Sequence, residues 1–157
     1  MKGRKSRMQG KVKRSAQAPV YVGIDVSKAR LDVYLHPLGE AFQVANDKSG
    51  WKAIKRRLKG HQVERVVVEA TGKYHRGVHR SLSGDGYCVA VINPFRSRRF
   101  GEALGVLAKS DKIDARVLAL SGEALKPGRT APAPKSLEEM PRIDDCDQGL
   151  QSRANGA

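Results

Sequence analysis

Four acidic residues occupy positions where a folded protein rarely tolerates a carboxylate. Two lie in apolar runs that are predicted to be strands, and two lie three residues apart near a predicted helix; they are Asp25, Glu69, Asp111 and Asp114. Acidic residues are depleted in strands and are almost never buried without a partner. In a chain of net charge +14, four converging carboxylates predict a divalent cation with oxygen ligands, Mg²⁺ or alternatively Mn²⁺.

Each of these acids also has a purely structural interpretation. Asp25 could cap a turn, and Glu69 could be an ordinary charge at a strand end. Asp111 could be a helix N-cap, with Asp114 as a first-turn acid that the helix dipole favours. The occurrence of all four together favours the metal interpretation. Two ions about 3.5–4 Å apart can activate a water molecule and stabilise charge on a scissile phosphate and its leaving oxygen.

The composition points to a polyanionic partner. Thirty Lys and Arg face sixteen Asp and Glu in 157 residues, and the pI is about 10.2. Nucleic acid is the simplest such partner, and an anionic membrane surface is the alternative. No apolar run approaches the roughly 20 residues that span a bilayer, so no membrane segment is expected. Two cysteines without metal spacing or a disulfide framework indicate a reduced, cytoplasmic compartment.

Hydrophobic periodicity predicts an α/β fold with five strands. Apolar or alternating runs indicate the strands, and helical spacing between them indicates a helix that starts near Asp47 and three later helices. The strands are expected at 20–26, 30–36, 40–45, 64–70 and 87–92, and the later helices at 74–82, 94–107 and 111–125. This order is that of the ribonuclease H-like fold, a mixed five-stranded sheet flanked by helices.

That fold would bring the four acids together. It places the first strand beside the end of the fourth, so Asp25 and Glu69 should be neighbours. Residues at i and i+3 share one side of a helix, so Asp111 and Asp114 should face the same way from the last helix. Their repulsion would couple the titration of the four carboxyl groups, and bound Mg²⁺ would relieve it.

Three regions of different composition are expected along the chain. Residues 1–18 form a basic arm, whose first fourteen residues carry seven basic side chains and no acid; it has no apolar leader core and is predicted to be disordered. Residues 19–126 form the catalytic domain. Residues 127–157 begin with a Pro-rich linker and continue as a disordered tail, and the acidic character of that tail suggests a frameshift or truncation.

Four motifs resemble one known family. The segments 23–28 (Gly-Ile-Asp-Val-Ser-Lys), 69–72 (Glu-Ala-Thr-Gly), 93–94 (Asn-Pro) and 109–115 (Lys-Ser-Asp-Lys-Ile-Asp-Ala) are similar to those of DEDD insertion-sequence transposases. That family includes the pilin-gene invertases, and its N-terminal domain is similar to RuvC-type Holliday-junction resolvases. The resemblance implies that the metal-binding acids are Asp25, Glu69, Asp111 and Asp114. Ser110 stands where the family more often has Thr.

The resemblance also implies partners and a mechanism. Family members cleave and transfer DNA strands with Mg²⁺, are guided by a structured RNA and act as oligomers. Basic residues near the acid motifs are then candidate nucleic-acid contacts, although each is also an ordinary surface residue: Lys28, Lys73, Lys109, Arg96, Arg98 and Arg99. The family is longer and adds a coiled coil and a second domain that supplies a nucleophilic serine. No counterpart follows Pro134, so the chain is expected to be incomplete for transposition alone and to be a monomer or weak dimer.

Two other functions compete with a transposase domain. The chain could be a non-catalytic remnant that only binds nucleic acid. It could also be a fragment of a sugar kinase or actin-like ATPase, since that superfold also begins with an apolar strand containing Gly-Ile-Asp. The kinase fold normally places Gly-Thr or Gly-Ser after the aspartate to wrap phosphate, whereas Val26-Ser27-Lys28 follows here, which disfavours this alternative.

Overall fold

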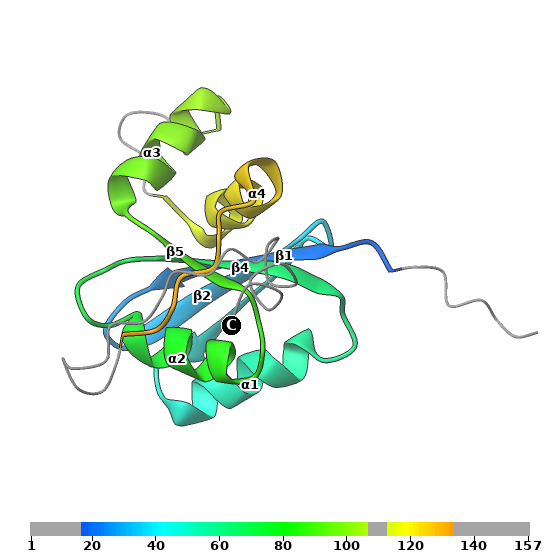
Figure 1. Ribbon diagram of the computed structural model, residues 1–157, viewed down its shortest axis with the longest axis vertical. Coiled ribbons are helices and arrows are strands. Elements are labelled where there is room, and N and C mark those ends of the chain that lie inside the picture. The colour runs from blue at the N-terminus through cyan, green and yellow to red at the C-terminus, as the bar shows by residue number, and fades with distance from the viewer. Residues whose placement is uncertain (1–16, 107–112, 134–157) are drawn as a thin grey trace, which may run out of the picture.

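Five strands form one mixed sheet in the computed structural model, which describes residues 17–106 and 113–133 (Figure 1). The first three strands form an antiparallel meander, and the fourth and fifth are parallel to the first. The order across the sheet is β3-β2-β1-β4-β5. The strands are β1 (Val20–Val26), β2 (Arg30–His36), β3 (Glu40–Ala45), β4 (Val63–Glu69) and β5 (Val89–Ile92). This is the ribonuclease H-like arrangement, so the predicted fold class is confirmed.

Two helices cover each face of the sheet (Figure 1). The helices α1 (Lys48–Leu58) and α2 (Arg76–Gly84) lie on one face, and α3 (Pro94–Ala103) and α4 (Ala115–Leu125) lie on the other. Side-chain caps fix where α1 and α3 begin, and both starts agree with the positions that the sequence predicts. The Asp47 carboxylate accepts a hydrogen bond from Gly50 N at 2.9 Å, and Asn93 Oδ1 accepts one from Arg96 N at 2.8 Å.

The start of α4 differs from the prediction. The helix begins at Ala115 rather than at Asp111, and Asp114 is its N-cap with an extended backbone. The Asp114 carboxylate accepts a hydrogen bond from Val117 N at 3.0 Å, which satisfies a donor that the first helical turn leaves without a partner. The expectation that Asp114 projects from one side of the helix was therefore wrong. Asp111 lies outside the described residues.

Gly23 allows α4 to lie directly against β1. A Cβ atom at Gly23 would be 1.9 Å from Ala115 O and 2.6 Å from Ala119 N, distances that no side chain can occupy. The opposite face of β1 is filled by apolar side chains, Ile24 among them, that pack with Ile54 of α1. The absence of one side chain thus sets the distance between the first turn of α4 and the sheet.

The segment after α4 crosses from one face of the sheet to the other along β5 (Figure 1). Arg65, which is buried in β4, donates a hydrogen bond to Pro127 O at 2.8 Å. Thr130 N donates to Val89 O at 2.9 Å, and His79 Nε2 lies 2.8 Å from Thr130 O. Residues 126–133 contain no helix or strand, yet hydrogen bonds with β4, β5 and α2 hold them against the edge of the sheet.

The contact between His79 and Thr130 predicts a pH-dependent stability. Burial lowers the pKa of His79, and the neighbouring His75, Arg80 and Arg129 add to this, against the raising effect of the Thr130 carbonyl. The unfolded chain therefore takes up the proton first. Stability should be fully present above the ordinary histidine pKa of about 6.5 and should be lost as the pH falls below it.

Thermal denaturation between pH 7.5 and 5 measures this effect. His79→Gln keeps a side-chain donor for the Thr130 carbonyl but cannot be protonated, so its melting temperature should fall less steeply with acid. His61→Gln, in the turn after α1, is the matched histidine control. Equal slopes for the wild type and His79→Gln would contradict a titrating His79.

The cysteine prediction requires one correction. No disulfide framework was expected from the sequence, but Cys88, just before β5, is disulfide-bonded.

Candidate carboxylate site

Asp25 and Glu69 lie at the carboxyl ends of two neighbouring parallel strands. Ile24 of β1 is in register with Val68 of β4, so the next residue on each strand brings Asp25 beside Glu69. Both acids are half-buried. Ile24 and Val68 point into the core beneath α1 and α2, and because side chains alternate along a strand, the two acids face the layer of α3 and α4.

Ser97 of α3 holds the Glu69 carboxylate. Ser97 is fully buried, and its hydroxyl donates to Glu69 Oε2 at 3.0 Å, with Pro94 O also 3.0 Å away. The sequence analysis missed this residue. The sequence pattern that could have revealed Ser97 is its spacing from Gly101, one helical turn later. Both are small, buried residues in a helix whose other residues are mostly large or charged. The two small residues allow α3 to approach the sheet, which brings the hydroxyl to Glu69.

Replacing Ser97 with alanine tests this positioning. Ser97→Ala should leave the fold intact but free the Glu69 carboxylate to rotate. Residues that orient metal ligands typically contribute 10–100-fold to metal affinity, so the Mg²⁺ concentration that gives half-maximal thermal stabilisation should rise by about tenfold. Ser83→Ala, at another buried serine on α2, is the control. An unchanged half-maximal Mg²⁺ concentration would mean that Ser97 serves packing alone.

Asp32 is a third acid on the same face, and the sequence analysis did not select it. It pairs directly with Asp25 across the antiparallel β1–β2 ladder, and its carboxylate accepts a hydrogen bond from Gln43 Nε2 at 2.8 Å. Like charges directly opposite one another destabilise a sheet. Buried and exposed residues alternate strictly along β2, with Leu31 and Val33 buried. This alternation in the sequence could have predicted that Asp32 lies on this face. The pair favours a bound cation.

Asp114 borders a groove next to these strands. The groove has a volume of about 620 Å³, runs over β2 and β3 to the start of α4, and is lined by Asp32, Asp114 and Arg116 among others. Asp114 is exposed at this edge. Three of the four predicted acids are thus described: Asp25 and Glu69 as neighbours, and Asp114 at the end of the helix that packs on β1. Within residues 17–106 and 113–133, no group of three or more His, Cys, Asp or Glu is arranged to hold a metal ion.

The chemistry of these donors fits a hard divalent cation. Every candidate ligand on this face is a carboxylate, the oxygen ligand that Mg²⁺ and Mn²⁺ prefer. The opposed pair Asp25 and Asp32 concentrates negative charge that a cation would neutralise. Asp25 and Glu69 are the residues whose neighbouring positions suit a shared ion.

The predicted nucleic-acid contacts are mostly exposed. Lys28 follows β1 and Lys73 follows β4, both near the strand ends that carry the acids. On α3, Arg96 is exposed, Arg98 Nε lies 3.4 Å from Glu102 Oε1, and the Arg99 guanidinium stacks on Phe95 at 4.9 Å from the ring centroid. Lys109 lies outside the described residues.

Comparison with known proteins gives one family match and several relatives. The profile of a transposase family, the IS110-type DEDD transposases, matches residues 22–144. Pilin gene-inverting proteins of Moraxella bovis and Moraxella lacunata are each 26% identical over 113 residues, which are 68% of this chain and 35% of the relative. The chain thus spans about a third of the length of these curated relatives.

Solved structures with a similar fold include RuvC and a hexokinase. Thermus thermophilus RuvC in complex with a Holliday junction substrate aligns with a TM-score of 0.46 and 18% identity, over 68% of this chain and 93% of RuvC. A ROK hexokinase from the same organism aligns with a TM-score of 0.43 and 16% identity, over 59% of this chain and 39% of the kinase. At these levels the structural likenesses do not separate the two functions.

Proposed function

This chain belongs to the IS110-type DEDD transposases, and on that premise we propose that its RuvC-like domain cleaves and transfers DNA strands in a Mg²⁺-dependent reaction. One observation supports the proposal above the others. Asp25 and Glu69 lie side by side at the ends of parallel strands, and the buried Ser97 fixes one of the two carboxylates. Structural needs alone do not explain two half-buried acids at this point of a sheet.

In this proposal the acidic residues bind the metal and the basic residues bind the DNA. Asp25 and Glu69 would hold the metal, together with Asp114, the N-cap of α4, and Asp111, three residues earlier in the sequence. A bound Mg²⁺ would neutralise charge at the scissile phosphate and at the leaving oxygen. Lys28, Lys73 and Lys109, with Arg96, Arg98 and Arg99, would contact the DNA backbone around the acids, and the basic arm would add non-specific electrostatic affinity.

A cleavage assay on branched DNA tests the proposal. The purified chain is incubated with a labelled four-way junction, a nicked duplex and an intact duplex, with Mg²⁺, Mn²⁺, Ca²⁺ or EDTA. Cleavage of the junction or the nicked duplex is expected with Mg²⁺ and Mn²⁺ only. Binding without cleavage under every condition would instead support the alternative that the chain is a nucleic-acid-binding remnant without catalytic activity.

We further propose that complete strand exchange requires more than this chain. The curated relatives that it matches are about three times as long, and the family resemblance assigns the nucleophilic serine, a structured guide RNA and oligomer formation to the longer protein. Joined product should therefore appear only when a full-length relative is added to donor DNA, target DNA and RNA.

We also place the chain in the cytoplasm, where the DNA substrate is. In the described part of the chain, no helix is long and apolar enough to cross a membrane. The disulfide at Cys88 is unusual for that compartment, so the family assignment alone supports this placement.

A further inference from the structure

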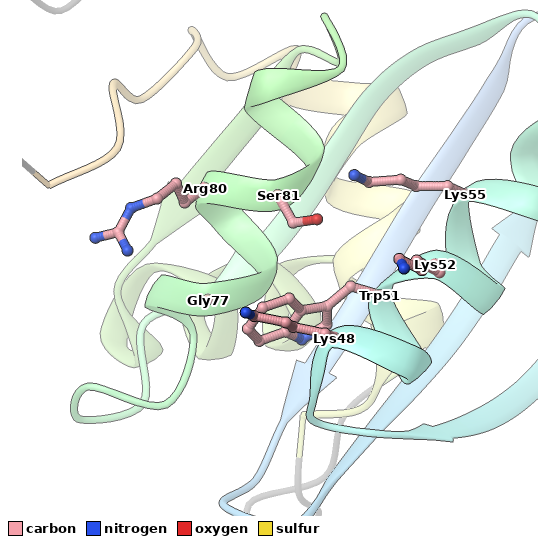
Figure 2. Close-up of a pocket in the computed structure, with 7 residues that line it drawn as sticks. All are labelled: Lys48, Trp51, Lys52, Lys55, Gly77, Arg80 and Ser81. Atoms are coloured by element: carbon pink, nitrogen blue, oxygen red, sulfur yellow. The ribbon is translucent and has the colours of Figure 1, made fainter.

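A second basic surface lies on the opposite face of the sheet from the carboxylates. The two helices of that face form a groove with a volume of about 450 Å³ (Figure 2). Basic side chains and one aromatic ring dominate its lining, which consists of Lys48, Trp51, Lys52, Lys55, Gly77, Arg80 and Ser81. Asp25 and Glu69 face the layer of α3 and α4, so a strand bound in this groove lies on the other side of the sheet from them.

The charge of this surface is one-sided. Helix α1 contains five Lys or Arg and no acid, and α2 contains two Arg and no acid. Lys48, Lys52 and Lys55 are spaced by four and three residues, so they form a row along one side of α1. Of these three lysines, only Lys55 has an acidic partner among the described residues, with its Nζ 3.1 Å from Asp85 Oδ2. A row of lysines of this kind complements a phosphate backbone.

Trp51 provides an apolar floor for the groove. Its ring is half-buried and lies against the backbone of α2, because a Cβ atom at Gly77 would be 2.2 Å from Trp51 Cζ2. The indole nitrogen already donates to Asn46 Oδ1 at 3.0 Å. The hydrogen-bonding capacity of the indole is thus used within the protein, and what remains for a ligand is the aromatic surface, which suits a base or sugar ring.

The aromatic floor of the groove selects the form of the nucleic acid. In a duplex the faces of the bases are stacked on one another, so they cannot reach Trp51. A single strand can lay its phosphates along the lysine row and its bases toward Trp51. Cleavage and exchange of DNA strands would supply such single-stranded segments.

We propose that the groove between α1 and α2 binds single-stranded DNA, as a second nucleic-acid site separate from the carboxylate face. The choice of DNA rests on the proposed function, namely that this domain acts on DNA. The site would hold a displaced or flanking strand away from the reacting phosphate while the acids act on another segment.

The chain has a single tryptophan, so its fluorescence reports on this site alone. The full chain is titrated with an oligothymidine of about twenty nucleotides, and the Trp51 emission is followed together with the fluorescence anisotropy of the labelled oligonucleotide. Quenching of Trp51 with saturation is expected. DNA held only by the basic arm would change the anisotropy without quenching Trp51, so the two sites are distinguishable in the unmodified protein.

Paired variants test the lysine row. Lys48→Gln with Lys52→Gln removes two exposed charges, and because each contact to a single strand contributes about 0.7 to the salt slope, the slope should fall by about 1.4. Affinity should fall more than tenfold at 0.1 M salt, and the quenching should be lost. Arg57→Gln with Lys126→Gln removes the same charge at residues that do not line the groove, one of them stacked on Phe42 instead, and should have a much smaller effect. Lys48→Arg with Lys52→Arg should restore binding.

Several results would overturn the proposal. Quenching that persists in the Lys48 and Lys52 double variant, or equal losses in both double variants, would show that the groove does not bind the strand. Quenching by oligouridine but not by oligothymidine would assign the groove to RNA. Asp25→Asn should leave the quenching unchanged, so that failure of the groove proposal and failure of the cleavage proposal give different results.

Discussion

Replacing Gly23 with alanine is expected to destabilise the domain strongly, although it adds only one methyl group. The new Cβ atom would be 1.9 Å from Ala115 O and 2.6 Å from Ala119 N. Both neighbours are backbone atoms of α4, so the clash is relieved only if the whole helix moves away from β1. Overpacking usually costs about 1–3 kcal/mol, and we expect the upper end of that range here.

The melting temperature measures this cost. For a domain of about 100 residues, 1 kcal/mol corresponds to about 4–8 °C, so Gly23→Ala should lower the melting temperature by more than about 10 °C. Gly84→Ala is the matched control, because a Cβ atom there meets nothing within 4 Å and alanine favours a helix. Similar melting temperatures for the two variants would show that α4 does not lie directly on β1.

The same variant connects the fold to the candidate site. Helix α4 carries Asp114 at its N-cap, and Gly23 lies two residues before Asp25 on the strand beneath. A helix that has been displaced from β1 moves Asp114 away from the strand end that holds Asp25. At a temperature low enough for the Gly23→Ala variant to stay folded, we therefore expect it to bind DNA but to lose metal-dependent cleavage.

The sheet was predictable from the sequence because its strands have strong and simple patterns. The three strands of the meander were predicted with the bounds that the structure has, 20–26, 30–36 and 40–45. An apolar run predicts a strand covered on both faces, and strict alternation predicts one covered on a single face. Asp47 and Pro94 are local helix-start signals, which need no tertiary information.

The start of α4 and the burial of Arg65 were not predictable in this way. Asp114 can be read as a residue inside the helix or as its cap, because an aspartate side chain competes for backbone donors in both settings. Arg65 interrupts an apolar strand and is buried with a hydrogen bond to Pro127 O, 62 residues further along the chain. A contact between residues so far apart depends on the path that the chain takes around the sheet edge, which local periodicity does not contain.

The candidate site likewise contains residues that the sequence reveals and residues that it does not. Asp25 and Glu69 were selected because an acid in an apolar run is conspicuous. Ser97 and Asp32 were missed because neither is unusual in its own segment. Ser97 gains significance only from the approach of α3 to Glu69, and Asp32 only from the register that sets it opposite Asp25. Register and helix approach are three-dimensional facts, and they identify the residues that support the acids.

Asp25→Asn is expected to abolish metal-dependent cleavage. The substitution keeps the shape of the side chain but removes the charge of the acid that lies beside Glu69 and opposite Asp32. Metal ions contribute several kcal/mol to transition-state stabilisation, and each 1.36 kcal/mol is tenfold in rate. Junction cleavage should therefore fall by at least about a thousandfold. Asp47→Asn, which preserves the cap of α1 since asparagine also caps helices, should cleave normally.

Stability measurements separate loss of the metal from loss of the fold. Without metal, Asp25→Asn should remain folded with a cooperative melting transition, because asparagine keeps the shape of the side chain. With Mg²⁺ in excess, the wild type should gain stability by mass action, and the variant should not. If Mg²⁺ stabilises both proteins equally, Asp25 is not a ligand, and the cation must bind at acids other than the pair that β1 and β4 bring together.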